Sequence, residues 1–245
     1  MRKYSTALKN EKMSQQLAGS LNDEAGLRTR EGNRFGLLIK RTIDIVLSVL
    51  VIVLGFPFFA AIALIIKATS PGPVFFKQTR IGKNGRSFVM YKFRTMREGI
   101  DDSVHREFTQ NFIKGNGAYS ELDASGAKIY KLTNDARVTG VGAFLRKVSL
   151  DELPQFINIL RGEMAIVGPR PPLPYEYECY EEWHKRRVTV KPGLTGLWQV
   201  QGRSSVPFDQ MVRLDIHYIE NWSLLMDLKI MLLTIPVMLA GTGGH

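Results

Sequence analysis

Cysteine and histidine are scarce in this sequence, and its glycines form no familiar phosphate-binding pattern. The single cysteine, Cys179, cannot form a disulfide within the chain, and the four histidines are scattered, so no Cys/His group has the spacing of a zinc site. We therefore expect a reducing compartment, and oxygen ligands for any metal. The sequence also has no nucleotide-binding glycine fingerprint and no internal repeat.

Acidic residues are in the minority. Lys and Arg total 33 against 23 Asp and Glu, which gives a net charge of +10 and a pI of about 9.7. This excess favours an anionic partner, and nucleic acid, acidic lipid and phosphorylated substrates all meet that condition. With 245 residues and 44% hydrophobic content, the chain can form one substantial domain with an appendage.

The N-terminal segment, residues 1–35, is polar and charged and has no sustained apolar period. It begins too hydrophilic to contain the apolar core of a signal peptide. We interpret it as a basic, mobile tail.

A 24-residue apolar stretch from Ile43 to Ile66 follows the tail and contains Asp44 and Ser48 as its polar interruptions. About 20 apolar residues suffice to cross a bilayer, so one transmembrane helix is the simplest interpretation. However, five Lys or Arg flank each end, so the positive-inside rule gives no orientation, and Pro57 should kink or break a helix. A re-entrant helical hairpin over residues 36–69 satisfies both features, and the two alternatives stay open from these residues alone.

The residues after Pro73 predict a small β-hairpin. Both Val74 to Ile81 and Ser87 to Phe93 are rich in β-branched and aromatic residues, and Asn84-Gly85 between them suits a turn with positive φ. Residues 98–130 follow as a polar, partly helical insertion.

Helical patterns dominate the rest of the chain. Residues 150–160 indicate a helix ended by Gly162, and residues 208–222 indicate an amphipathic one. The apolar stretch 224–239 carries charged residues, which favours a helix in the membrane interface over a second span, with a buried core helix as the alternative. The predicted fold class is therefore α/β of the α+β kind, helix-rich and without a large parallel sheet.

The densest polar cluster surrounds Asp151 and Glu152. One interpretation is a helix start, in which Ser149 and Glu152 form a capping box. The other is chemical, because a helix N-terminus attracts phosphate and keeps a carboxylate ionised. Adjacent Asp151 and Glu152 can share one Mg²⁺, and an ionised carboxylate beside a neutralised phosphate can attack phosphorus.

Three basic segments are candidates for binding phosphate or nucleotide. Lys92 and Arg94 follow two-residue alternation at the end of a strand, so they could clamp a diphosphate or form a solvated strand edge. Arg170 lies between two prolines, where the rival interpretation is a polyproline-type peptide ligand. The segment around Trp198 and Arg203 could contact a base or sugar, although Trp198 is equally typical of a core.

Six ordered motifs resemble the bacterial sugar transferase family, the monotopic polyprenyl-phosphate phosphoglycosyl transferases that start exopolysaccharide and glycoconjugate assembly. The resemblance covers the chain from about Phe35 to the C-terminus. The motifs are Lys40 to Asp44, Ser70 to Gln78, Lys92 to Met96, Ser149 to Gln155, Val167 to Pro171 and Pro192 to Gln199.

The resemblance implies a re-entrant membrane segment followed by a catalytic domain, residues 70–245, on the cytoplasmic face of the bacterial inner membrane. It implies Mg²⁺ dependence and a covalent intermediate on Asp151, with Glu152 supporting the metal and phosphate. It also matches Lys92, Arg146 and Arg170 to positions that hold phosphates or the nucleotide.

The expected partners are a UDP-sugar, here closest to UDP-glucose or UDP-galactose users, polyprenyl (undecaprenyl) phosphate and the inner leaflet. We expect no nucleic acid and leave homo-oligomer formation open. The rival functions are a membrane-tethered adaptor and a membrane-associated nucleic-acid binder. Neither rival explains why an Asp-Glu pair accompanies separate Arg/Lys clusters.

Overall fold

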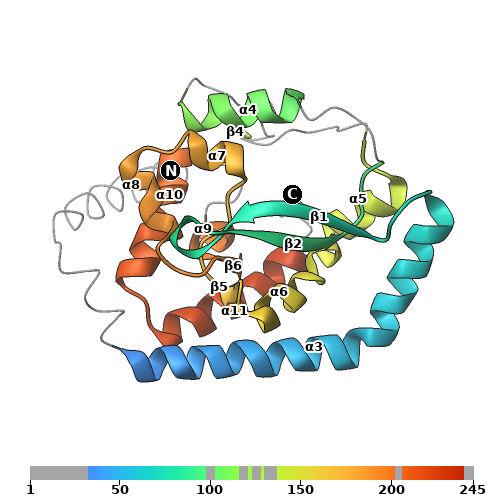
Figure 1. Cartoon of the computed structure of the whole chain (residues 1–245), viewed down its shortest axis with the longest axis horizontal. Helices are drawn as coiled ribbons and strands as arrows, with labels where there is room; N and C mark the ends of the chain where they lie inside the picture. The colour runs from blue at the N-terminus through green and yellow to red at the C-terminus, as the bar shows by residue number, and fades with distance from the viewer. Residues whose placement is uncertain are drawn as a thin grey trace, which may run out of the picture.

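The computed structural model describes residues 33–97, 103–115, 121–122, 128–129, 137–201 and 206–239. Most of the predicted tail, Arg203 and part of the 98–130 insertion lie outside these residues. In Figure 1 one long helix, α3, runs along an edge of the molecule, and the other elements pack on one side of it.

Helix α3 spans Arg34–Thr69, and the Asn33 side chain accepts a hydrogen bond from the Gly36 amide at its start. By length and composition it can cross a membrane, and 11% of its most apolar window is buried, which is too little for a core helix. The predicted apolar segment is confirmed as helical, but it forms one continuous helix and not two helices separated by a break. Pro57 lies inside it without ending it, and the ribbon changes direction in its second half (Figure 1).

Both ends of α3 are attached to the same body. Near its start, the Arg41 guanidinium donates to the carbonyls of Ile159 and Leu160 at 2.6 and 2.9 Å. Near its end, Ile62 and Ile66 pack in a buried cluster with Phe93 and Leu145. Helix α3 is thus bound to the rest of the protein at two separated places.

The predicted hairpin is confirmed. Strands β1 (Phe75–Ile81) and β2 (Ser87–Phe93) pair antiparallel, with Phe75 opposite Phe93. The turn η1 (Lys83–Gly85) contains Asn84 at φ 57° and Gly85 at φ 75°. These are the two positions where a turn needs the left-handed region.

Short elements connect the hairpin to the C-terminal helices, and the described residues form three two-stranded sheets. The helix-rich α/β prediction is confirmed. In chain order the remaining elements are α4 (Ser103–Ile113), β3 (Glu121–Leu122), β4 (Lys128–Ile129), α5 (Gly140–Lys147), η2 (Leu150–Glu152), α6 (Gln155–Arg161), β5 (Ala165–Val167), α7 (Pro174–Glu178), α8 (Glu182–Lys185), η3 (Arg186–Val188), β6 (Gly193–Thr195), α9 (Leu197–Gln201), α10 (Phe208–Glu220) and α11 (Leu224–Leu239).

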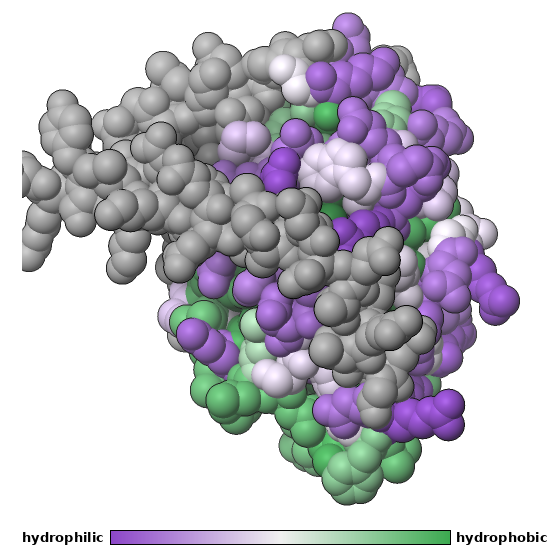
Figure 2. Space-filling model, turned by 90° about the vertical axis from the view of Figure 1, so that its left-hand side faces the viewer, coloured by the Kyte–Doolittle hydropathy of each residue, from purple (hydrophilic) through white to green (hydrophobic). Residues whose placement is uncertain are grey.

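The main core lies between α6, β5, α9, α10 and α11, and includes Ile159, Trp198 and Tyr218. The amphipathic helix predicted over 208–222 is confirmed as α10, whose inward face is buried. Helix α11 buries Ile230 but exposes Leu225 and other apolar side chains. Figure 2 shows hydrophobic side chains gathered along the lower edge of the molecule, the edge that α3 follows in Figure 1.

Candidate active site

A pocket lies between β2, the start of α6, the loop after β5, and α9. Its lining combines cations, one carboxylate and two amides with a few apolar groups. The lining residues are Arg80, Met90, Lys92, Glu152, Gln155, Arg170, Pro171, Gly193, Leu194 and Gln199. Predicted site residues Lys92, Glu152 and Arg170, distant in sequence, therefore meet in one place.

The turn η2 presents Asp151 and Glu152. The predicted 150–160 helix is divided here, because η2 and α6 are separate elements joined through Pro154. Ser149 adopts a left-handed conformation with φ 57°, and its side chain makes no capping hydrogen bond. The capping-box interpretation is therefore wrong, since an N-cap residue needs an extended backbone to reach the following amides.

Lys92 connects the two carboxylates. Its Nζ donates to Glu152 Oε1 at 2.6 Å and lies 3.8 Å from Asp151 Oδ2. Asp151 is 5% exposed, and burial raises its pKa to about 6, with Glu152 raising it further and Lys92 and Arg146 opposing the shift. Burial outweighs two nearby cations, so ionising Asp151 is costly but still favourable near neutral pH.

Arg80 lines the same pocket and was missed by sequence reasoning. It is 5% exposed, and its guanidinium donates to the Pro171 carbonyl at 3.0 Å and to Gln78 Oε1 at 2.7 and 3.0 Å. Burial and the neighbouring Arg170 lower its pKa to about 10. Arg80 is a buried cation that donates hydrogen bonds to neutral groups and lies beside a second guanidinium, which creates an excess of positive charge suited to an anion.

The hairpin register contains a signal that could have found Arg80. Cross-strand pairing sets Gln78 opposite Met90 and Arg80 opposite Phe88, so these positions share a face with Lys92. Counting back from the Asn84-Gly85 turn would have placed Arg80 on that face. The amides of Gln155 and Gln199 carried no comparable signal.

Two other predicted binding residues fall elsewhere. Arg94 is buried and donates to the carbonyl and hydroxyl of Ser70 at 2.8 and 2.7 Å, where it holds the residue that ends α3. It does not line the pocket, because β2 ends at Phe93 and the two-residue alternation ends with it. Arg203 lies outside the described residues.

The segment around Arg170 is part of the folded domain. Pro171, Pro172 and Leu173 are buried, and α7 begins at Pro174. Because a polyproline-type ligand must present this segment to a partner, that alternative is not supported. Trp198 is 4% exposed and belongs to the main core.

The chemistry of the donors suits one class of metal. Within the described ranges, no group of three or more His, Cys, Asp or Glu side chains is placed to hold an ion. Mg²⁺ commonly uses one or two carboxylates together with substrate phosphates and water. The pair of Asp151 and Glu152 fits that donor set, although Glu152 is here bound by Lys92.

The fold and pocket define a protein with a membrane-competent helix and a basic pocket lined by Glu152, with Asp151 next to it in the chain. Residues 35–241 match the family described as bacterial sugar transferase, and the chain belongs to that family. The chain is 43% identical over 211 residues to the exopolysaccharide production protein ExoY of Sinorhizobium fredii, covering 86% of this chain and 89% of that protein.

Two longer relatives carry more specific names. The UDP-glucose:undecaprenyl-phosphate glucose-1-phosphate transferase of Escherichia coli is 41% identical over 206 residues, which cover 81% of this chain and 39% of that protein. The undecaprenyl-phosphate galactose phosphotransferase of Salmonella typhimurium is 38% identical over 213 residues, or 86% and 43%. The chain therefore spans less than half the length of these two relatives.

Proposed function

We propose that this chain transfers a hexose 1-phosphate, glucose or galactose phosphate, from a UDP-hexose to undecaprenyl phosphate and releases UMP. This is the first membrane step of exopolysaccharide or glycoconjugate synthesis. The observation that carries the proposal is that Glu152, Lys92, Arg80 and Arg170 line one pocket, while the buried Asp151 lies 3.8 Å from Lys92 Nζ. The names of the relatives from Escherichia coli and Salmonella typhimurium support the substrates.

In the first half-reaction, a carboxylate oxygen of Asp151 attacks the β-phosphorus of the UDP-hexose. The bond from that phosphorus to the bridging oxygen breaks, and UMP leaves with the electron pair. In the second, a phosphate oxygen of the lipid attacks the same phosphorus and the carboxylate of Asp151 is restored. The rival role for Asp151 is general base, but a phosphate monoester is already largely ionised near pH 7 and gains little from one.

The basic residues neutralise the substrate and the leaving group. A diphosphate carries several negative charges, and guanidinium groups hold phosphate oxygens in charge-assisted hydrogen bonds. Arg80 and Arg170 suit the leaving UMP, while Lys92 and Arg146 act on the reacting end near Asp151. Mg²⁺, held by Glu152 with Asp151, would withdraw charge from the phosphates.

The attachment of α3 supports a re-entrant placement in the inner leaflet. A straight helix of 36 residues is about 54 Å long, and a spanning helix separates its ends by a bilayer of about 30 Å. Here both ends bind one body, and the helix bends between them (Figure 1). We infer that both ends face the cytoplasm, with residues 70–245 as the catalytic domain and α11 in the interface.

The test is a panel of UDP-hexoses incubated with the purified chain, Mg²⁺ and undecaprenyl phosphate. One UDP-hexose should release UMP and yield a lipid-linked hexose diphosphate. An adaptor or a nucleic-acid binder would release no UMP from any donor. Removing Mg²⁺ with a chelator should stop the reaction, and restoring Mg²⁺ should recover it.

A further inference from the structure

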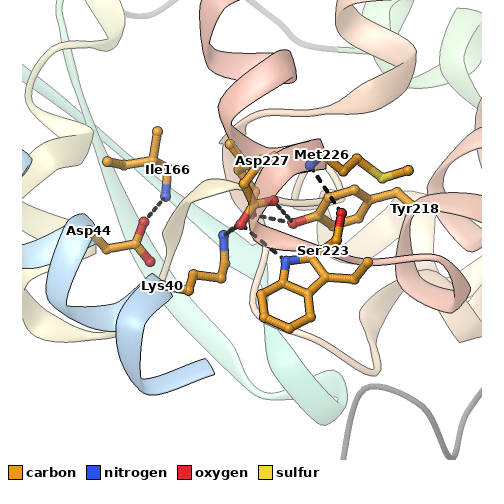
Figure 3. A network of polar contacts seen from close by, with 9 residues as sticks. Lys40, Asp44, Ile166, Tyr218, Ser223, Met226 and Asp227 are labelled. Atoms are coloured by element: carbon orange, nitrogen blue, oxygen red, sulfur yellow. Dashed lines mark hydrogen bonds and ion pairs between the residues drawn. The ribbon is translucent and has the colours of Figure 1, made fainter. Parts of the chain in front are cut away.

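A buried polar network joins the start of α3 to α10, α11 and the end of β5 (Figure 3). Its centre is Asp227, which is 4% exposed. Asp227 Oδ2 accepts from Lys40 Nζ at 2.7 Å and from Trp222 Nε1 at 3.1 Å, and Oδ1 accepts from the Tyr218 hydroxyl at 2.7 Å. Both carboxylate oxygens are therefore satisfied, so the charge has a fixed position.

The same network holds the backbone at the end of β5. The Val167 carbonyl accepts from Lys40 Nζ at 3.0 Å and lies 3.1 Å from the Tyr218 hydroxyl, whose single hydrogen it shares with Asp227 Oδ1. The preceding amide, of Ile166, donates to Asp44 Oδ1 at 3.1 Å (Figure 3). Side chains from α3 and α10, oriented by Asp227, thus set where β5 ends.

The loop that starts there carries Arg170 into the pocket. The Gly168 amide donates to the Thr195 carbonyl at 2.9 Å, and the Pro169 carbonyl accepts from the Gly193 amide at 2.8 Å. A Cβ at Gly168 would lie 2.7 Å from the Lys191 carbonyl, so only glycine fits this approach. At the other end of the loop, Arg80 donates to the Pro171 carbonyl. The loop is therefore held by hydrogen bonds on both sides of Arg170.

We propose that Asp227, through Lys40 and Tyr218, is a positioning residue that fixes Arg170 for binding the diphosphate of the nucleotide sugar. The proposal rests on the proposed function for its ligand but concerns binding, which needs no turnover. A buried ion pair often contributes no more stability than an apolar pair of similar size. However, an apolar pair could not donate a hydrogen bond to the Val167 carbonyl, as Lys40 does.

The test compares UDP affinity in four proteins: the wild type, Lys40→Met/Asp227→Leu, Arg170→Ala, and all three substitutions together. Replacing both network charges leaves neither one buried alone. We expect UDP affinity to fall about tenfold when the network is removed, since small displacements of a binding group have effects of this size or more. In the Arg170→Ala background, removing the network should change the affinity by less than about twofold, because the network acts through Arg170.

Equal losses in both backgrounds would overturn the proposal, as would unchanged UDP affinity in Lys40→Met/Asp227→Leu. Tyr218→Phe provides a second cycle if the double variant does not fold: it keeps the ion pair but removes one donor to Val167, and a loss of a few-fold is expected with Arg170 present. No loss there also overturns the proposal.

A matched control is the buried pair Arg187 and Asp215, which joins η3 to α10 and touches no pocket residue in the contacts described. Arg187→Met/Asp215→Leu should leave UDP affinity unchanged. A tenfold loss of UDP affinity in this control would show that removing any buried ion pair has the same effect, and would overturn the proposal. A wild type that binds UDP but releases no UMP overturns the proposed function alone. A wild type that does not bind UDP overturns both.

Discussion

At the scale of single residues, Asp151 combines two opposing conditions. Burial disfavours its ionised form and raises its pKa to about 6, whereas Lys92 and Arg146 favour the ionised form. At pH 7.5 the carboxylate is mostly ionised yet poorly solvated, which suits a nucleophile. The same burial means that ionised Asp151 lowers the free energy of unfolding.

The first prediction concerns the covalent step. With Mg²⁺ and the correct UDP-hexose but no lipid, the wild type should release about one UMP per active site, as ping-pong kinetics require, and gain the mass of a hexose phosphate. Asp151→Asn should show neither, because an amide is a poor nucleophile towards phosphorus. Intact-mass measurement after rapid quench checks this. Sequential kinetics without an adduct would favour the general-base role.

The second prediction is that Asp151→Asn is more stable than the wild type near pH 7.5. The folded-state pKa of about 6 lies above the ordinary value of 3.8, so the ionised carboxylate destabilises the fold above pH 6. That cost disappears as the pH falls from 6 towards 4, where the folded state takes up the proton. Tm should rise by a few degrees at pH 7.5, since about 1 kcal/mol shifts Tm by roughly 2–4 °C at this chain length.

The Tm difference between the two proteins should shrink at pH 5, where wild-type Asp151 is largely protonated. An equal difference at both pH values would show that the gain has another origin. Glu152→Gln at the same pH values controls for removal of a negative charge beside Lys92.

The third prediction separates two arginines. Arg80→Met should raise KM for the UDP-hexose by roughly tenfold to a hundredfold, because a charge-assisted contact contributes about 1.5–3 kcal/mol. Arg94→Met should lower Tm by releasing Ser70 but leave KM close to that of the wild type. Thermal melts and initial rates decide between them. A KM effect confined to Arg94→Met would restore the diphosphate clamp predicted from strand alternation.

At the scale of elements, sequence patterns correctly predicted the helices and turns that depend on interactions between neighbouring residues. The β1–β2 hairpin and α10 followed from a turn pair and a helical period, which neighbouring residues set by themselves. The parallel pairing of β5 with β6 could not be predicted, because each strand has three residues and 25 residues lie between them. Since that pairing sets the Arg170 loop, the sequence indicated the site residues better than their arrangement.

The division between η2 and α6 was also hidden. A residue such as Ser149 suits an N-cap by type, so its left-handed backbone could not be read from sequence. Arg94 was expected beside Lys92 by two-residue alternation, but β2 ends at Phe93 as predicted and the alternation does not extend to Arg94. Tertiary packing at both places overrode the local preference.

The fourth prediction concerns the topology of α3. In a Cys179→Ser background, single cysteines replacing Ser5, before the helix, and Lys83, in the hairpin turn, should both react with a reagent that reaches the cytoplasm alone. Both ends of α3 bind one body, so they should lie on one side of the membrane. Labelling of the two positions from opposite sides would establish a spanning helix.

At the scale of the whole molecule, apolar and charged surfaces are separated. Exposed apolar side chains lie along α3 and on α11, including Leu54, Leu64 and Leu225. Figure 2 shows this edge as hydrophobic, with hydrophilic residues above it. The net charge of +10 then favours an anionic bilayer at that edge. We therefore expect the reaction with the lipid acceptor to need membrane contact, and the reaction with the soluble UDP-hexose not to need it.

The last prediction uses that difference through α11. Leu225 and Leu232 are 75% and 58% exposed, so replacing them with glutamate opens no cavity in the fold. Each leucine buried in lipid contributes about 1.5–3 kcal/mol to membrane binding, which a charge at the interface would cancel. Leu225→Glu/Leu232→Glu should therefore bind anionic vesicles at least tenfold more weakly and transfer hexose phosphate to undecaprenyl phosphate more slowly. UMP release from the UDP-hexose in the absence of lipid should stay at the wild-type level, because the pocket is untouched. Leu225→Ala/Leu232→Ala, which keeps the surface apolar, should lie between the two in vesicle binding. If the glutamate variant transfers to lipid as fast as the wild type, α11 does not contact the membrane and α3 alone seats the enzyme there.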